Sequence, residues 1–384
     1  MRLLVTLACS VAVLAVPATA AAGRWVAGDL HVHTTYSHDS YGGPTDDNTG
    51  PEDIFTAGHT VTDDFALART RGLHFLAISD HMDVRSQSDP GFGSSRVLGL
   101  PAYENSLDGH AQMLGATRVY DNGDRSAAAV KALADALHAD GGLLQANHPT
   151  EPPWEYGYEV PLDTIEVWNL PWYYQPPAPS SSNNTQALRW WESWLDRGAR
   201  VAATGGSDSH WLSTTAAQGP GQPTTWVYAK KLTVRGVLAG IRAGRTSVSA
   251  EPPAYGGARV VLQADRDRDG RFESMQGATV RRGTPLRVRV LGASAVGSHV
   301  RVVSNGGREA VAPKLVTSPR FTHRFKLRAR GKLTWARGEV YGEDRPDLRQ
   351  SGCEPVFGGD GAFSETYCVN RIAMQALSSA IYLR

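Results

Sequence analysis

The periodicity of the chain changes near residue 250, and this change limits the fold more than any other feature of the 384-residue sequence. Before this point, short apolar runs alternate with stretches whose apolar residues repeat at helical spacing. After it, short alternating strands follow one another, separated by Gly-rich turns. The chain is long enough for two domains of ordinary size. We therefore expect an α/β domain followed by a smaller all-β domain.

The first part predicts seven or eight βα units. Strands are expected at residues 24–32, 73–79, 114–120, 143–146, 164–168, 201–204, 225–229 and 246–249, and helices at residues 62–71, 125–139, 185–197 and 234–243. In the second of these helices, Val130, Leu133 and Leu137 form one stripe, as in a helix that covers a sheet. Repeated βα units indicate a barrel or an open parallel sheet.

The second part predicts a β-sandwich. Its expected strands are residues 259–263, 286–291, 299–304, 321–327 and 333–341, and residues 252–257 form a Pro- and Gly-rich linker before them. Basic side chains fall on one side of these period-two strands, at Arg287, Arg289, Arg324, Lys326 and Arg328. A solvated outer face is the simplest interpretation of this pattern.

The N-terminus is typical of a secretory signal. Arg2 precedes an apolar run from residue 3 to 16, and small residues that allow cleavage after Ala20 or Ala22 follow it. The run is shorter than the ~20 apolar residues that a membrane-spanning helix needs. We expect residues 1–22 to be removed, and the mature protein, with domains at 23–251 and 258–384, to be secreted or extracytoplasmic.

Export decides how the cysteines are interpreted. Cys9 would leave with the signal, so Cys353 and Cys368 remain as a pair in a compartment that permits disulfides. We expect them to be bonded, which by loop-closure entropy would stabilise the fold by roughly 3 kcal/mol. Two unpaired buried thiols are the alternative.

Charge is divided unevenly between the two parts. Residues 23–257 carry 16 basic and 26 acidic side chains, whereas residues 258–384 carry 22 basic and 12 acidic ones. The two parts therefore have opposite net charges of ten units each. The basic residues are spread along strands rather than clustered with stacking aromatics, so no specific nucleic-acid partner is expected. The oligomeric state is left open.

The candidate chemistry lies in the histidines, ten of which fall between positions 31 and 210. Most follow a predicted strand, and in α/β barrels and open parallel sheets the carboxyl ends of strands form the functional site. His31 and His33 share one side of a strand by the two-residue period. The further candidates are Glu104 and His110, which are expected in a loop, and His38, Asp80, His81, His148, Asp208 and His210.

Neutral imidazole and carboxylate are ligands that suit Zn, Mn and Fe. A hydrogen-bonded loop histidine would explain any one of these residues alone, but it does not explain the set. The set exceeds what one ion uses, so we predict two or three divalent transition-metal ions. The predicted ligands are His31, His33, His38, His81, Glu104, His110, His148, Asp208 and His210.

On these motifs, the chain resembles the PHP (polymerase and histidinol phosphatase) family of metal-dependent phosphoesterases over residues 28–249. The resemblance implies a distorted (β/α)7 barrel with a cluster of two or three metals at the carboxyl ends of its strands. It implies one metal on His31, His33, Glu104 and Asp208, a second on Glu104, His110 and His148, and a third on His38, His81 and His210.

The implied reaction is hydrolysis by a metal-bound hydroxide, with the cations neutralising charge that grows on the substrate oxygens. Asp80, His81 and His210 are the catalytic candidates, and Asp80 either protonates the leaving group or holds a ligand imidazole. Trp168, Asn169 and Arg245 are the candidates for contacting the substrate, although packing would also explain Trp168.

Three functions stay open. Residues 166–169 and 244–246, with the C-terminal β-domain, resemble the branch of the family that includes carbaryl hydrolase, whose members are not all phosphoesterases. The leading prediction is an exported phosphoesterase that acts on a small phosphomonoester or phosphodiester. The alternatives are a carboxylic ester, carbamate or amide hydrolase on the same cluster, and a non-catalytic surface-binding protein.

A second metal is suggested outside this cluster. Asp265, Asp267 and Asp269, followed by Gly270, match the first half of a calcium loop. The twelfth position is Gln276, which cannot supply the bidentate carboxylate that such loops use. A weak structural calcium site and a plain polar turn are therefore both consistent with this segment.

Overall fold

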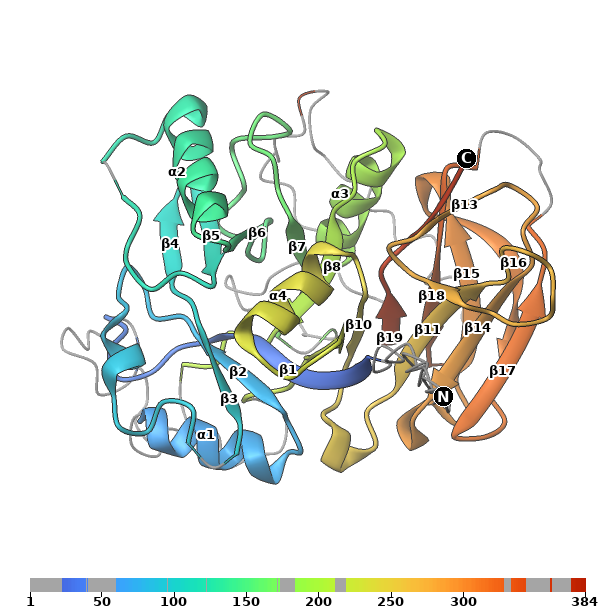
Figure 1. The fold of residues 1–384 in the computed structure, drawn as a ribbon, viewed down its shortest axis with the longest axis horizontal. Helices are drawn as coiled ribbons and strands as arrows, with labels where there is room; N and C mark the ends of the chain where they lie inside the picture. Colours follow the sequence, from blue (N-terminus) through green and yellow to red (C-terminus); the bar gives the residue numbers. More distant parts are fainter. Residues whose placement is uncertain are drawn as a thin grey trace, which may run out of the picture.

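The computed structural model describes residues 23–38, 40, 60–94, 96–121, 123–170, 172, 184–210, 219–327, 333–342, 360 and 374–384. The expected signal segment 1–22 and the Cys353–Cys368 pair lie outside these residues, so both stay predictions. Within the described residues, no helix is long and apolar enough to cross a membrane. The chain is mixed α/β and has two parts (Figure 1).

The strands of the first part form two sheet regions. One contains β1 (Arg24–Val32), β2 (Phe75–Ile78), β3 (Leu98–Pro101), β9 (Thr224–Ala229) and β10 (Thr246–Ser249), in the order β10-β9-β1-β2-β3. The other contains β4 (Glu104–Leu107), β5 (Gly109–Leu114), β6 (Leu143–Ala146), β7 (Thr164–Asn169) and β8 (Ala202–Gly206), in chain order. These strands are buried along most of their length, as strands covered on both faces are.

In the part of the chain that the structure describes, four helices cover these sheets: α1 (Val61–Thr70), α2 (Ala127–Ala139), α3 (Asn184–Asp196) and α4 (Val234–Arg242). They pack on β2, β6, β7 and β9 respectively (Figure 1). The side chains of Thr60, Ser126 and Thr233 cap α1, α2 and α4 by accepting hydrogen bonds from backbone N–H groups of the first turn. The predicted stripe of Val130, Leu133 and Leu137 is buried, which confirms its orientation toward the sheet.

Among the described residues, two single bridges link the two sheet regions, which form no continuous ladder with each other. Val32 bridges to Ser209 and His81 bridges to Glu104, both in parallel orientation. At the first bridge, the His33 N–H donates to the Ser209 carbonyl at 2.9 Å and the Asp208 N–H donates to the His31 carbonyl at 2.9 Å. The carboxyl ends of β1, β2 and β8 are therefore held close to one another.

Three sequence expectations are wrong in detail. The strand expected at residues 114–120 is instead β5, which ends at Leu114 because Gly115 turns the chain at φ +85°. Glu104 and His110 lie in strands rather than in a loop, because β4 and β5 pair as a hairpin around Gly109 at φ +90°. The sheet is also mixed rather than purely parallel, since β9 runs antiparallel to both β1 and β10.

The second part has two facing sheets. The first contains β11 (Arg259–Ala264), β12 (Ser274–Met275), β14 (Leu286–Leu291) and β17 (Arg320–Phe325). The second contains β13 (Thr279–Val280), β15 (His299–Ser304), β16 (Arg308–Leu315), β18 (Trp335–Tyr341), β19 (Met374–Ser378) and β20 (Ile381–Leu383). Short 3-10 turns are η2 (Arg85–Ser88) in the first part, η3 (Pro253–Tyr255) after β10, and η4 (Ala293–Ala295) and η5 (Asn305–Gly307) in the second part.

One hydrophobic core joins these facing sheets. Val260 and Val288 of the first sheet pack with Val300 and Val340 of the second. Along β14, buried residues alternate with half-buried Arg287 and Arg289, which confirms the predicted period of two. Arg324 and Lys326 are exposed near the end of β17, and Arg328 lies outside the described residues.

The two parts share a sheet. β19 pairs with β18 on one side and with β10 on the other, so the sheet continues from one part into the other (Figure 1). Arg337 on β18 donates to Glu192 of α3 at 2.5 Å, and the Trp335 indole donates to Asp196 of α3 at 2.7 Å. The end of α3 is therefore anchored on the β-rich part by buried polar contacts.

Candidate metal centre

Strand ends bring the candidate ligands together. His31 is on β1 and His33 follows its end, while His81, His148 and Asp208 follow β2, β6 and β8. Glu104 begins β4, and the single bridge between Glu104 and His81 joins its backbone to the end of β2. Residues far apart in the sequence thereby meet at one edge of the sheets, as expected for the carboxyl ends of parallel strands.

Four donor residues form the centre of the cluster: His31, His33, Glu104 and Asp208. The Nε2 atoms of His31 and His33 lie 3.0 Å apart. Each of these nitrogens is 3.2 Å from Glu104 Oε2 and 3.2 Å from Asp208 Oδ1. These are the four residues that the family resemblance assigns to one metal.

The donor atoms of this group fit a cation. Glu104 Oε2 and Asp208 Oδ1 are buried and have no hydrogen-bond partner. A buried carboxylate oxygen left without a partner is destabilising, and such oxygens are normally paired or coordinate a metal. Because two imidazole nitrogens and two such oxygens converge on one point, the group has the composition of a site for Zn, Mn or Fe.

The other oxygen of Glu104 faces a second pair of histidines. Glu104 Oε1 is 3.2 Å from His110 Nδ1 and 3.1 Å from His148 Nε2. Asn147 Nδ2 donates to the same oxygen at 2.8 Å and helps to hold the carboxylate in place. Glu104 therefore presents one oxygen to His31 and His33 and the other to His110 and His148, as a bridging ligand would.

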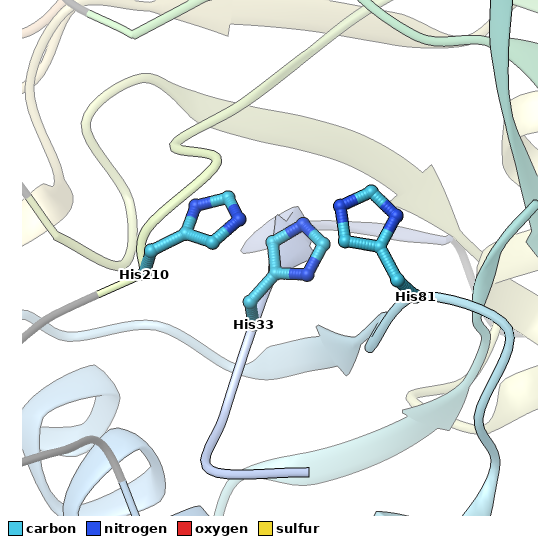
Figure 2. A group of neighbouring side chains, drawn as sticks. All are labelled: His33, His81 and His210. Carbon is cyan, nitrogen blue, oxygen red and sulfur yellow. The ribbon is translucent and has the colours of Figure 1, made fainter. Parts of the chain in front are cut away.

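A third group lies on the other side of His33. The rings of His33 and His210 stack with centroids 4.0 Å apart, and those of His33 and His81 are 4.7 Å apart. Figure 2 shows these three side chains, which come from different segments and point toward one another. The His38 ring centroid is 5.1 Å from that of His81, but His38 is exposed and does not join a group with His81 and His210.

Glu166 of β7 is the residue that the sequence analysis did not assign to the site. Its Oε1 lies 3.1 Å from His31 Nδ1, while its Oε2 accepts hydrogen bonds from the His148 N–H at 2.9 Å and from Asn169 Nδ2 at 3.1 Å. Glu166 also groups with His31 and His148 as a potential ligand. Its position inside the strand predicted at residues 164–168 was the available signal, because strands of a parallel sheet are covered on both faces and a carboxylate there needs polar partners.

The other candidates take different places. Asp80 is buried and accepts hydrogen bonds from the Thr34 N–H at 2.6 Å and the Thr34 hydroxyl at 2.9 Å. Asp80 therefore stabilises the turn that follows β1. Asn169 Nδ2 donates to Asp208 Oδ2 at 3.2 Å and so lies against the cluster. Trp168 is buried and packs edge-to-face on Trp172 with ring centroids 5.0 Å apart.

Arg245 precedes β10 and lines a cavity with Arg200, Tyr228, Arg242 and Arg266. Among the described residues that line this cavity, none belongs to the histidine cluster. In this structure, the guanidinium therefore belongs to a different surface from the candidate metal centre.

Charges in the cluster reinforce one another. Burial would lower the pKa of His31, but Asp208, Glu104 and Glu166 raise it well above its ordinary value. Burial likewise would raise the pKa values of Glu104 and Asp208, but the histidines around them, His31 foremost, hold both values well below the usual range. For His148, burial would lower the pKa, but the hydrogen bond that its Nε2 donates to Glu104 and the charges of Glu104 and Asp208 raise it to about 9.

Exposure is uneven across the cluster. His31, His33 and Glu104 are at most 1% exposed, whereas the His110 side chain is 23% exposed and those of Asp208 and His210 are 16% exposed. Solvent therefore touches the cluster at the side chains of His110, Asp208 and His210.

Comparisons with known proteins add little. Neither a protein-family model nor a curated protein matches the chain. A solved structure of a two-domain protein from Bacteroides vulgatus, described as containing a predicted PHP-like metal-dependent phosphoesterase, is similar with a TM-score of 0.41 and 14% identity. The similarity covers 83% of this chain and 90% of that one. At this score and identity, it supports no statement about the site or its activity.

Proposed function

We propose that the chain is an exported PHP-like metal-dependent hydrolase with a distorted (β/α)7 barrel, and that it cleaves a small phosphomonoester or phosphodiester. The observation that carries the proposal is the convergence of His31 and His33 Nε2 with the buried oxygens of Glu104 and Asp208. A site built only for structural hydrogen bonds would pair each imidazole nitrogen with one acceptor, whereas here two nitrogens and two carboxylate oxygens converge on one point.

His31, His33, Glu104 and Asp208 would hold one ion, and Glu104, His110 and His148 a neighbouring one. His81 and His210 would serve a third ion with either His33 or His38. Such cations, when bound, activate water for attack and neutralise negative charge that develops on the substrate. The chain itself orients the ligands, through Glu166 on His31 and Asn169 on Asp208.

Charge favours a phosphoester over a neutral ester. Two or three divalent ions would exceed the negative charge of Glu104, Asp208 and Glu166, the carboxylates that face them. An anionic substrate would therefore be attracted, and positive charge would stabilise its transition state more than its ground state. The acidic balance of residues 23–257 disfavours long polyanions, which supports a small substrate.

The first test is metal content. Protein purified without chelator is expected to contain at least two transition-metal ions per chain. His33→Ala and Asp208→Ala should lose metal and activity while keeping the circular dichroism spectrum, and Asp124→Asn, which changes an exposed carboxylate outside the candidate ligand groups, is the control. Full activity of a metal-free preparation would refute the proposal.

The second test is the substrate class. Nitrophenyl phosphates and the matching carboxylic esters and carbamates are compared with Mn, Zn or Fe supplied, and a phosphate should have the highest kcat/KM. If an ester or carbamate exceeds every phosphate by more than about tenfold, equal to ~1.4 kcal/mol in the transition state, the ester or carbamate hydrolase replaces the phosphoesterase.

Export is part of the same proposal and has its own readout. N-terminal sequencing of protein recovered outside the cytoplasm should begin at Ala21 or Gly23. Mass spectrometry without reduction should show Cys353 bonded to Cys368. Protein that keeps residues 1–22 and two free thiols would contradict export without bearing on the hydrolase.

A further inference from the structure

We propose that the hairpin loop between β11 and β12 binds a calcium ion through Asp265, Asp267, Asp269 and Glu273. One carboxylate oxygen from each of these residues lies within 4.8 Å of the others. The loop joins paired strands, since Ala264 is opposite Ser274 and Gln263 is opposite Met275. The ion would therefore close a loop whose two ends are already fixed by the sheet.

Asp265 is the residue that points to a cation rather than to a polar turn. It is only 4% exposed, and its Oδ2 accepts the Gly270 N–H at 3.0 Å. Its Oδ1 is buried and has no hydrogen-bond partner. The same carboxylate is one of the four that lie close together in the loop. A buried carboxylate oxygen of this kind needs a donor or a metal.

The spacing of the loop matches a calcium loop up to its ninth position. Asp265, Asp267 and Asp269 occupy positions 1, 3 and 5, and Gly270 at position 6 adopts φ +88°, which makes the sharp turn that such loops require. Glu273 at position 9 then joins the cluster with its own carboxylate. In the twelve-residue calcium loop, the ninth position often binds the ion through water. Here the Glu273 carboxylate would take the place of the ligand at position 12.

Gln276 at position 12 is engaged elsewhere. It is buried, its Oε1 accepts the Leu262 N–H at 3.1 Å and its Nε2 donates to the Thr246 carbonyl at 3.2 Å. Gln276 therefore ties β11 to β10 and takes no part in the loop. The lack of a carboxylate at position 12 does not weaken the site, because Glu273 supplies the fourth carboxylate.

The hydrogen bonds of the loop do not replace an ion. The Asp269 N–H donates to Asp267 and the Arg271 N–H donates to Asp269, so both side chains form local turns. Arg271 approaches Asp269 at 3.7 Å but its side chain is 88% exposed, so it screens the carboxylates weakly. Four negative charges within a few ångströms repel one another, and a divalent cation removes this repulsion.

The donor chemistry selects calcium. All four side chains offer oxygen, without the imidazole or thiolate that transition metals favour, and a loop with three exposed ligands suits an ion that accepts irregular geometry. The remaining positions would be completed by a backbone carbonyl and water. We expect a Kd of roughly 0.1–1 mM, in the range of extracellular calcium modules, and weaker binding of magnesium.

The test is calcium titration of the full-length protein with the melting temperature as readout, and magnesium as the comparison ion. Calcium should raise the melting temperature at millimolar concentration, since a ligand that binds only the folded state stabilises it. Asp267→Asn and Glu273→Gln should each weaken calcium binding at least about tenfold, because affinity follows the number of charged ligands. Asn at position 267 keeps the oxygen that accepts the Asp269 N–H, so the turn itself should survive.

Controls separate this site from the histidine cluster. Asp124→Asn removes an exposed carboxylate that also accepts a backbone N–H two residues ahead, and it should leave calcium binding unchanged. Asp208→Ala should likewise keep the calcium response while losing transition metal. No shift of the melting temperature up to about 10 mM calcium, well above the expected Kd, would overturn the proposal. Unchanged calcium affinity in both Asp267→Asn and Glu273→Gln would overturn it as well.

Discussion

Glu166 Oε1 lies 3.1 Å from Nδ1 of His31, on the side of the ring opposite the Nε2 that faces Glu104 and Asp208. A hydrogen bond from Nδ1 to a carboxylate fixes the tautomer that leaves Nε2 free to bind a metal, and it makes the imidazole a better ligand. Glu166 therefore orients His31 from behind, whether or not it binds an ion itself.

Glu166→Gln should weaken metal binding by about 10- to 100-fold. Glutamine keeps a single acceptor oxygen, whereas Glu166 has donors at both oxygens, so one of them would face an amide nitrogen. Metal titration monitored by calorimetry measures the effect. If the number of ions at saturation is unchanged, Glu166 only orients His31, and if one ion is lost, Glu166 is a ligand. Wild-type affinity and stoichiometry in the variant would contradict both roles.

Gly206→Ala should damage the metal site through packing alone. A Cβ at this position on β8 would lie 2.3 Å from His31 Cβ and 2.5 Å from Glu166 Oε1, so one of these groups must move. We expect metal affinity to fall at least about tenfold, as for other changes behind the ligands. Gly123→Ala is the packing control: no atom lies within 4 Å of its added Cβ, so its only cost is backbone strain at φ +73°. Equal metal affinity in both variants would show that β8 can move away from β1 without disturbing metal binding.

Arg337→Ala should destabilise the fold by about 3–5 kcal/mol, because it leaves buried carboxylates without their partner. Arg337 donates to Glu192 and Glu339, and burial would raise the pKa of Glu339 if Arg301 and Arg337 did not bring it to about 2. Urea denaturation gives the free energy of unfolding. Arg118→Ala removes an ion pair whose arginine is 62% exposed and should leave the free energy of unfolding nearly unchanged. If Arg337→Ala also lowers the free energy of unfolding only slightly, water must enter the contact between α3 and β18.

His138 should contribute stability that depends on pH. Its Nε2 lies 2.6 Å from Asp163 Oδ2, and this hydrogen bond raises the pKa of His138 in spite of partial burial. Because the folded pKa is above the unfolded value of about 6.5, the stabilisation is fully present below that pH and is lost as pH rises through the folded pKa. The free energy of unfolding of wild type minus His138→Gln should therefore be larger at about pH 6 than at about pH 9. The change should stay under about 1 kcal/mol, since His138 is a third exposed. If this difference in the free energy of unfolding does not change with pH, the His138–Asp163 ion pair does not contribute to stability.

Much of the first part could be predicted because its patterns are local. The strands at residues 24–32, 143–146 and 246–249 have the expected bounds, and all four helices lie within two residues of their expected positions. The hairpin β4–β5 was missed because the residues on either side of its turn, including Glu104 and His110, are mostly polar. Nothing in the local pattern distinguishes such a hairpin from a polar loop.

The sequence by itself determined which residue types carry the chemistry, since His31 and His33 two apart on a strand must share one face. Tertiary structure alone decided that Glu104 turns one oxygen to His31 and the other to His148, and that Glu166 lies behind His31. It also decided that β19 pairs with β10 across more than a hundred residues of chain. Periodicity reports the face on which a side chain lies, whereas strand order and the distance between two side chains depend on which segments pack together.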